Sequence, residues 1–195
     1  MIIHNQEYKY SLENVLFVFA LEMEAAEVFK NQHILFTGIG KVHATYELTK
    51  AIYHKKPDLI INLGSAGSGT FSKGDVVCCT QFVQRDMDVR GLGYALYETP
   101  FSGVPSPFQY GLQIEDLPQG ICGTGDNFEM SHNETKYNVV DMEAYALATI
   151  AMKENIPFVC LKYISDGADD NAADDWTESV HKAALAFGNI FQIND

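Results

Sequence analysis

Three acidic side chains in the sequence stand where they could do chemistry. Glu24 lies in the segment ALEME, Glu143 in VDMEA and Asp166 in YISDGAD, and each segment follows or opens an apolar run. A carboxylate that is buried without partners is costly, so an acid inside an apolar run indicates a use for its charge or its proton. Carboxyl groups on opposite sides of one bond can supply the acid and the base of a reaction. These three acids are therefore the candidate catalytic and binding groups.

Structural roles remain open for some of the acids. Glu22 lies two residues before Glu24, and residues two apart on a helix or turn do not share a face, so at most one of them should point into a site. Asp141 flanks the start of a predicted helix, where the helix dipole favours an anion, so it can serve as an N-cap. A capping role is also an alternative for Asp166, which follows a predicted strand.

The elements that must position these acids follow from hydrophobic patterns. Continuous apolar runs predict buried strands at 15–20, 33–37, 59–63, 76–82, 121–124, 139–140 and 157–165. Helical patterns cover 21–30, 42–55, 142–154 and 176–191, the last with Asp174 or Asp175 as its N-cap. The small residues GSAGSG predict a turn after the third strand, and the proline- and glycine-rich stretch 85–119 predicts surface loops. Strands that alternate with helices indicate an α/β fold whose mostly parallel sheet is covered on both faces.

Polar or glycine-rich clusters fall at the predicted strand ends. They are ALEME, TGIGKV, NLGSAGSG, GTGDNFEM, VDMEA and YISDGADD. In sheets of this kind ligands bind beyond the carboxyl ends of the strands. The clusters therefore predict one crevice lined with acids, glycines and an aromatic residue.

The composition excludes several partners. The formal net charge is -13, and the arginines are Arg85 and Arg90, whereas nucleic acids and anionic membranes require clustered basic residues. The four cysteines lie in strand-like runs without a CxxC pair, which predicts buried, reduced thiols and a cytoplasmic protein. The N-terminal residues lack the pattern of a secretory signal, and no apolar run has the length of a membrane-spanning helix.

Other kinds of site lack their motifs. TGIGKV has Val42 where a phosphate-binding loop carries Ser or Thr, and GSAGSG departs from the dinucleotide-binding spacing. The histidines show no metal-binding spacing, and DGADDNAADD lacks the alternating ligands and the terminal Glu of a calcium loop. We therefore expect no metal and no cofactor.

In order and type, the clusters resemble the nucleoside phosphorylase superfamily and, within it, the 5'-methylthioadenosine/S-adenosylhomocysteine nucleosidases. The matching pieces are ALEMEAAEV, TGIGKVHA, INLGSAGS, DMDV, GDNF, VDMEAYALA and IPFVCLKYISDGAD. The resemblance implies a single domain over residues 1–195, of three-layer α/β/α architecture with a central, mostly parallel, mixed sheet. It also implies hydrolysis of the N-glycosidic bond of a purine nucleoside, with release of the free base.

The resemblance implies a role for each site residue. Asp166 would be the general acid that protonates the departing purine, with Ser165 orienting its carboxyl group. Glu24 would hold and activate the attacking water. Glu143 would bind the ribose hydroxyls, with Met142 packing on the sugar. Carboxylates near the sugar also suit the positive charge that develops there in the transition state.

Further roles implied by the resemblance concern the walls of the site and the assembly. Phe128 would stack on the base, while Ser65 and Gly67 would line the sugar and water side. The segment 100–107 matches a region that reaches the pocket of a neighbouring subunit in this family, which implies a homodimer.

Three alternatives remain open: a purine nucleoside phosphorylase, a futalosine hydrolase and a non-catalytic nucleoside-binding protein. Phosphate requires cationic groups, but Glu24 stands near its expected position and the matching clusters contain no arginine, which favours water. The sequence departs from the family at Lys162, usually Arg, at Leu21, usually Met, and in the short segment 126–141. The short segment leaves the 5' group of the nucleoside undetermined.

Overall fold

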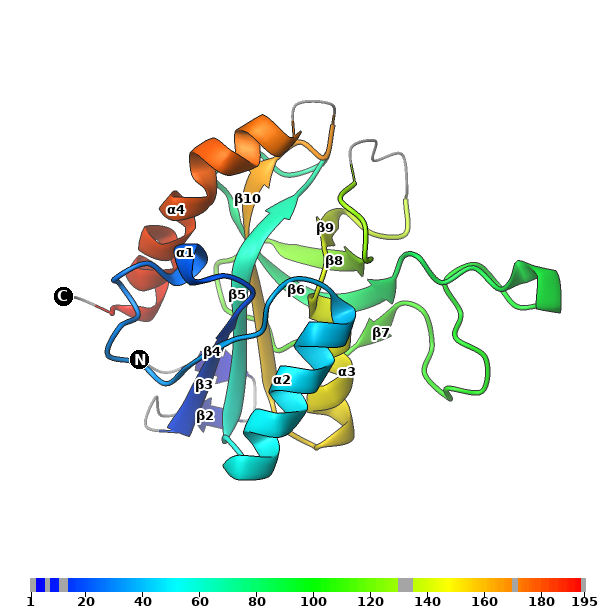
Figure 1. Cartoon of the computed structure of the whole chain (residues 1–195), viewed down its shortest axis with the longest axis horizontal. Coiled ribbons are helices and arrows are strands. Elements are labelled where there is room, and N and C mark those ends of the chain that lie inside the picture. The colour runs from blue at the N-terminus through cyan, green and yellow to red at the C-terminus, as the bar shows by residue number, and fades with distance from the viewer. Residues whose placement is uncertain (1–2, 6–7, 11–13, 130–134, 170–171, 194–195) are drawn as a thin grey trace.

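An eight-stranded sheet flanked by helices forms the body of the computed structural model, which describes residues 3–5, 8–10, 14–129, 135–169 and 172–193 (Figure 1). The strands of this sheet are β3 (Val15–Phe19), β4 (Ile34–Phe36), β5 (Leu59–Gly67), β6 (Val76–Gln84), β7 (Phe108–Gln109), β8 (Gln119–Thr124), β9 (Val139–Asp141) and β10 (Phe158–Asp166). The strands β1 (Ile3–Asn5) and β2 (Tyr8–Tyr10) form a separate antiparallel pair. The helices are α1 (Glu22–Ala25), α2 (Lys41–His54), α3 (Ala144–Lys153) and α4 (Ala172–Phe191).

The sheet is mixed and mostly parallel, as predicted. Strand β3 pairs in parallel with β4 and β5, β5 with β10, and β8 with β6 and β9. The antiparallel contacts join β10 to β6, β5 to β9 and β7 to β6. Because β5 pairs with both β9 and β10, part of the sheet closes on itself. Strand β9 meets β5 through Val140 and Gly67, so the carboxyl ends of these two strands converge.

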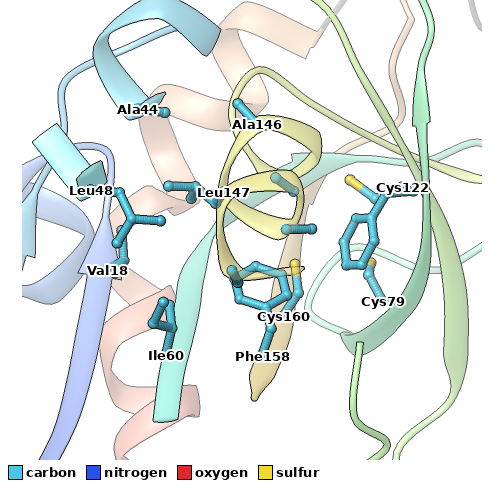
Figure 2. Packing of buried hydrophobic residues seen from close by; sticks show 14 of the residues in the cluster. Val18, Ala44, Leu48, Ile60, Cys79, Cys122, Ala146, Leu147, Phe158 and Cys160 are labelled. Carbon is cyan, nitrogen blue, oxygen red and sulfur yellow. The ribbon is translucent and has the colours of Figure 1, made fainter. Parts of the chain in front are cut away.

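Helices cover both faces of the sheet and bury its apolar side chains. Helices α2 and α3 pack on one face, where Leu48 and Leu147 lie close to Val18, Ile60 and Phe158 (Figure 2). On the other face, α4 packs against the sheet in a cluster that contains the aromatic residues Phe17, Phe19, Phe29, Phe187 and Phe191. The four cysteines are free and buried, which confirms the prediction of buried, reduced thiols; Figure 2 places three of them in the core.

Three predicted elements differ in the structure. The helix expected over 21–30 is a single turn, because Ala26 takes a φ of 46° and leaves the helical path. The residues expected to form a turn after Leu63 continue β5 as far as Gly67, because their backbone pairs with β10. Helix α4 begins at Ala172, so neither acid proposed as its N-cap precedes it.

Of the stretch 85–119 that was predicted as surface loops, residues 85–107 form an arm between β6 and β7, which projects from the body of the molecule (green in Figure 1), whereas Phe108–Gln109 form strand β7. The arm contains a short 3-10 turn at Arg90–Leu92 and exposes Leu92 and Phe101, with exposed fractions of 74% and 96%. Parts of the short segment 126–141 and of the acidic loop after Asp166, namely 130–134 and 170–171, lie outside the described residues. Within the described part of the chain, no helix has the length and apolarity that crossing a membrane requires.

Candidate active site

A cavity of about 390 Å³ lies where the carboxyl ends of β3, β5, β9 and β10 converge. All eight residues predicted from the sequence line it: Glu24, Ser65, Gly67, Phe128, Met142, Glu143, Ser165 and Asp166. Pockets for small molecules usually have volumes of about 300–1,000 Å³. The cavity therefore has the size of a small-ligand site, and it collects side chains from distant parts of the chain as the strand-end argument predicts.

Glu24 is fixed by donors from two strand ends. Its Oε1 accepts hydrogen bonds from the backbone N–H and the hydroxyl of Ser65, both at 2.8 Å, and its Oε2 accepts one from the Leu21 N–H at 3.1 Å. Glu24 is buried, whereas Glu22 is exposed, so only one of the two acids faces the site, as predicted. Gly64 favours this close packing, because a Cβ there would lie 3.2 Å from Glu24 Oε1, which is a tight contact.

Asp141 belongs to the support of the site. Its carboxylate forms an ion pair with Lys162 Nζ at 2.9 Å and accepts hydrogen bonds from the Thr124 hydroxyl and from the N–H of Ala144, the first residue of α3. The predicted interaction with the start of the helix is therefore present, although Glu143 occupies the N-cap position. Burial alone would raise the pKa of Asp141, but the Lys162 ammonium holds it below its ordinary value. The same pair raises the pKa of Lys162, against the effect of burial.

Glu143 lies beside this pair and has a different protonation equilibrium. Burial, together with the negative charge of Asp141, raises its pKa from 4.5 to about 8. Its Oε1 accepts a hydrogen bond of 2.8 Å from the backbone N–H of Gly40. Gly40 has a φ of 94°, a conformation that favours glycine, so the TGIGKV loop supplies a backbone donor to Glu143 and the phosphate-loop alternative is not needed to explain its glycines.

Asp166 ends β10 with its carboxyl group held on both oxygens. Oδ2 accepts a hydrogen bond from the Ser165 hydroxyl at 2.8 Å, and Oδ1 accepts one from the Ala168 N–H at 2.9 Å. A Cβ on Gly67 would lie only 2.5 Å from Oδ1, so glycine is required where β5 passes this carboxyl group. The Ser165 contact agrees with the predicted orienting role. The Ala168 N–H is a second hydrogen-bond donor to this carboxyl group, which the sequence did not indicate.

Two further residues that line the cavity were not predicted from the sequence. Trp176 reaches the site from α4 and donates a hydrogen bond from Nε1 to the Ser65 hydroxyl at 2.8 Å. Arg85 follows β6, and its side chain also lines the cavity, although the clusters that carry the family resemblance contain no arginine. Both residues come from segments that looked like a closing helix and a surface loop, and no local motif marked them.

Among the described residues, the acids of the cavity are not grouped as metal ligands. In the part of the chain that the structure describes, no group of three or more His, Cys, Asp or Glu side chains is arranged to hold a metal ion. The acids instead pair with backbone donors, hydroxyl groups and Lys162. The arrangement can provide a carboxyl group beside a bound ligand at three separate points.

Known proteins share this sequence and architecture. The sequence profile of the phosphorylase superfamily matches residues 21–192. A 5'-methylthioadenosine/S-adenosylhomocysteine nucleosidase of Anoxybacillus flavithermus is 30% identical over 188 residues, which cover 84% of this chain and 79% of that protein. The protein of the same name from Exiguobacterium sp. is 34% identical over 180 residues, covering 78% and 74%. The Neisseria meningitidis nucleosidase in complex with methylthio-immucillin-A is 26% identical, with a TM-score of 0.77 and coverage of 88% and 93%. This chain belongs to the phosphorylase superfamily, in which it is similar to 5'-methylthioadenosine/S-adenosylhomocysteine nucleosidases.

Proposed function

We propose that this protein is a purine nucleosidase that hydrolyses the N-glycosidic bond of an adenine nucleoside such as 5'-methylthioadenosine or S-adenosylhomocysteine. The observation that carries the proposal is that Glu24, Glu143 and Asp166 line one cavity of nucleoside size. The relatives named above support the choice of substrate, because they share most of the chain.

Asp166 is the proposed general acid. A purine leaves readily only when one of its ring nitrogens is protonated, and a positioned carboxyl group can deliver that proton with a gain of about 10²–10⁴ in rate. The hydrogen bonds from Ser165 and Ala168 fix both oxygens of this carboxyl group. Phe128 lines the same cavity and is the proposed stacking partner of the base.

Glu24 is the proposed base that binds the attacking water. The two donors of Ser65 and the N–H of Leu21 fix the carboxylate in one orientation. A carboxylate held in this way can accept a proton from water while the water attacks the sugar.

Glu143 is the proposed ligand of the ribose hydroxyls. With a pKa of about 8, its carboxyl group is largely neutral at pH 7 in the empty cavity. The positive charge that develops on the sugar as the bond breaks favours the ionised form, so the interaction strengthens in the transition state. Met142 lines the cavity next to this carboxyl group, where it can pack on the sugar.

Water is a better nucleophile here than phosphate. Among the residues lining the cavity, the one cation is Arg85, which is bound to Asn127 and Glu129. The nearby ammonium of Lys162 is already paired with Asp141. A phosphate placed beside Glu24 would therefore face a carboxylate without a cation to offset the repulsion.

The proposal includes a cytoplasmic homodimer. Two surfaces support self-association: the projecting arm with its exposed Phe101, and a groove over α2 and α3 lined by Val42, Tyr46 and Tyr53, which are 76%, 62% and 88% exposed. Exposed apolar patches of this kind are typical of interaction sites. Light scattering coupled to size-exclusion chromatography should give twice the chain mass; a monomer at micromolar concentration would contradict the proposed assembly.

The decisive experiment measures release of free base from a panel of nucleosides, with and without phosphate. We expect adenine from 5'-methylthioadenosine or S-adenosylhomocysteine at the same rate in both conditions. Adenosine, inosine and futalosine complete the panel and determine the base and the 5' group. A rate that requires phosphate would assign the protein to the phosphorylases, and the absence of any base release would overturn the proposed function.

A further inference from the structure

A buried guanidinium group supports the wall of the cavity that carries Phe128. The side chain of Arg85 is 4% exposed, and its backbone N–H donates to Thr124 O at 2.9 Å, which fixes the start of the side chain beside the end of β8. A Cβ on Gly125 would lie 2.8 Å from the guanidinium carbon. Glycine at position 125 therefore leaves the space that this guanidinium group fills.

The contacts of this guanidinium group lie on both sides of Phe128. Nη1 donates to Asn127 Oδ1 at 2.9 Å and forms an ion pair with Glu129 Oε2 at 3.1 Å, while Nη2 donates to the Asn127 backbone carbonyl. Phe128 itself lines the cavity and is 47% exposed. A half-exposed ring has few contacts of its own to hold it, so its position depends on the backbone on either side.

The far side of Glu129 is also anchored. The Tyr137 hydroxyl lies 3.3 Å from Glu129 Oε2, and the Tyr137 ring packs edge-on against Tyr97 with centroids 6.0 Å apart. Glu129 therefore connects Arg85 to an aromatic pair at the base of the arm. The segment 127–129 is fixed from two directions, and Arg85 makes the contacts nearest to Phe128.

We propose that Arg85 is a positioning residue that holds Phe128 in place for stacking on the purine. The proposal rests on the proposed function, in which Phe128 contacts the base. A ring that is already placed loses less conformational freedom when the ligand binds, so the affinity for the base increases. Arginine suits this role better than lysine, because its planar fork donates in several fixed directions at once.

The test uses three single variants, Arg85→Gln, Arg85→Lys and Phe128→Ala. It also uses the double variant that combines Arg85→Gln with Phe128→Ala. The chain contains one tryptophan, Trp176, and it lines the cavity, so its fluorescence can report the Kd for adenine without turnover. The KM and kcat for 5'-methylthioadenosine are measured in parallel. Arg90, whose partner Asp88 lies two residues away on the surface, provides the matched control Arg90→Gln.

We expect Arg85→Gln to raise the Kd for adenine and the KM for the nucleoside about tenfold, with kcat changed by less than about threefold. Loss of one base–aromatic stack corresponds to about five- to a hundredfold in affinity. Arg85→Lys should recover part of the loss, and Arg90→Gln should behave as the wild type. In the Phe128→Ala background, Arg85→Gln should have no further effect, because it acts through Phe128.

Several results would overturn the inference. These are an unchanged adenine Kd in Arg85→Gln, a loss confined to kcat, or effects of Arg85→Gln and Phe128→Ala that multiply in the double variant. If thermal unfolding indicates that Arg85→Gln does not fold, Glu129→Gln replaces it in the same cycle and should weaken adenine binding in a Phe128-dependent way. Base release by the wild type tests the proposed function separately. If the protein binds adenine in a way that depends on Arg85 and Phe128 but releases no base, only the catalytic proposal is refuted.

Discussion

Replacing Glu143 with Gln should make the protein more stable at high pH and stop turnover at the same time. Burial and the neighbouring Asp141 raise the pKa of Glu143 from 4.5 to about 8 in the folded state. Between these two values the folded protein holds a proton that the unfolded chain has released. The free energy of unfolding of the wild type therefore falls as pH rises through this range.

The size of the effect follows from the two pKa values. Because one pKa unit corresponds to about 1.36 kcal/mol, the ionised form of Glu143 is destabilised by about 5 kcal/mol in the folded protein. Glutamine has nearly the same shape, can still accept the hydrogen bond from the Gly40 N–H and does not titrate. The stability difference between Glu143→Gln and the wild type should grow by about 4 kcal/mol between pH 5 and pH 9.

Urea unfolding at pH 5 and pH 9 measures this difference, and subtracting the two proteins at each pH cancels the other titrating groups that they share. Glu22→Gln removes an exposed carboxyl group and is the matched control, for which the difference should stay constant. The same Glu143→Gln preparation should release base at least about a hundredfold more slowly. If the stability difference is the same at both pH values, the burial argument for Glu143 is wrong.

Three other substitutions test the rest of the site. Asp166→Asn should lower kcat by about 10²–10⁴ while nucleoside binding, measured by Trp176 fluorescence, stays within a few-fold; normal turnover would remove the proposed acid. Gly67→Ala places a Cβ 2.5 Å from Asp166 Oδ1 and should lower kcat about a hundredfold through misplacement of that carboxyl group, an effect that an unchanged kcat would contradict. Lys162→Met leaves the buried Asp141 without its cation and should reduce the free energy of unfolding at pH 7 by about 3–5 kcal/mol, whereas unchanged urea unfolding would argue against the ion pair as a major support.

The parts of the site that the sequence predicted are those encoded by neighbouring residues. Glu24, Glu143 and Asp166 each stand at the end of an apolar strand or at the start of an apolar helix, and a short local pattern is enough to place them at the carboxyl edge of a sheet. The parallel pairing of β3, β5 and β10 then brings Glu24 and Asp166 to the same edge. The local hydrophobic pattern was therefore sufficient to predict most of the strands and helices and the positions of the three acids.

What the sequence did not predict depends on contacts between distant segments. Strand β5 extends to Gly67 because β10 supplies its backbone partners, although small residues in isolation are typical of a turn. Trp176 reaches Ser65 only because α4 crosses the sheet beside the site. Arg85 lies in a segment rich in loops, and its importance appears only once the guanidinium group is seen beside Asn127 and Glu129.

The charge distribution of the cavity explains why one fold can hold acids in different protonation states. Asp141 stays ionised because Lys162 is directly paired with it, and this leaves Glu143 with a negative neighbour and no cation in contact among the described residues. The site is therefore poised to become more negative as positive charge develops on the sugar, a response that favours a cationic transition state and opposes an anionic nucleophile.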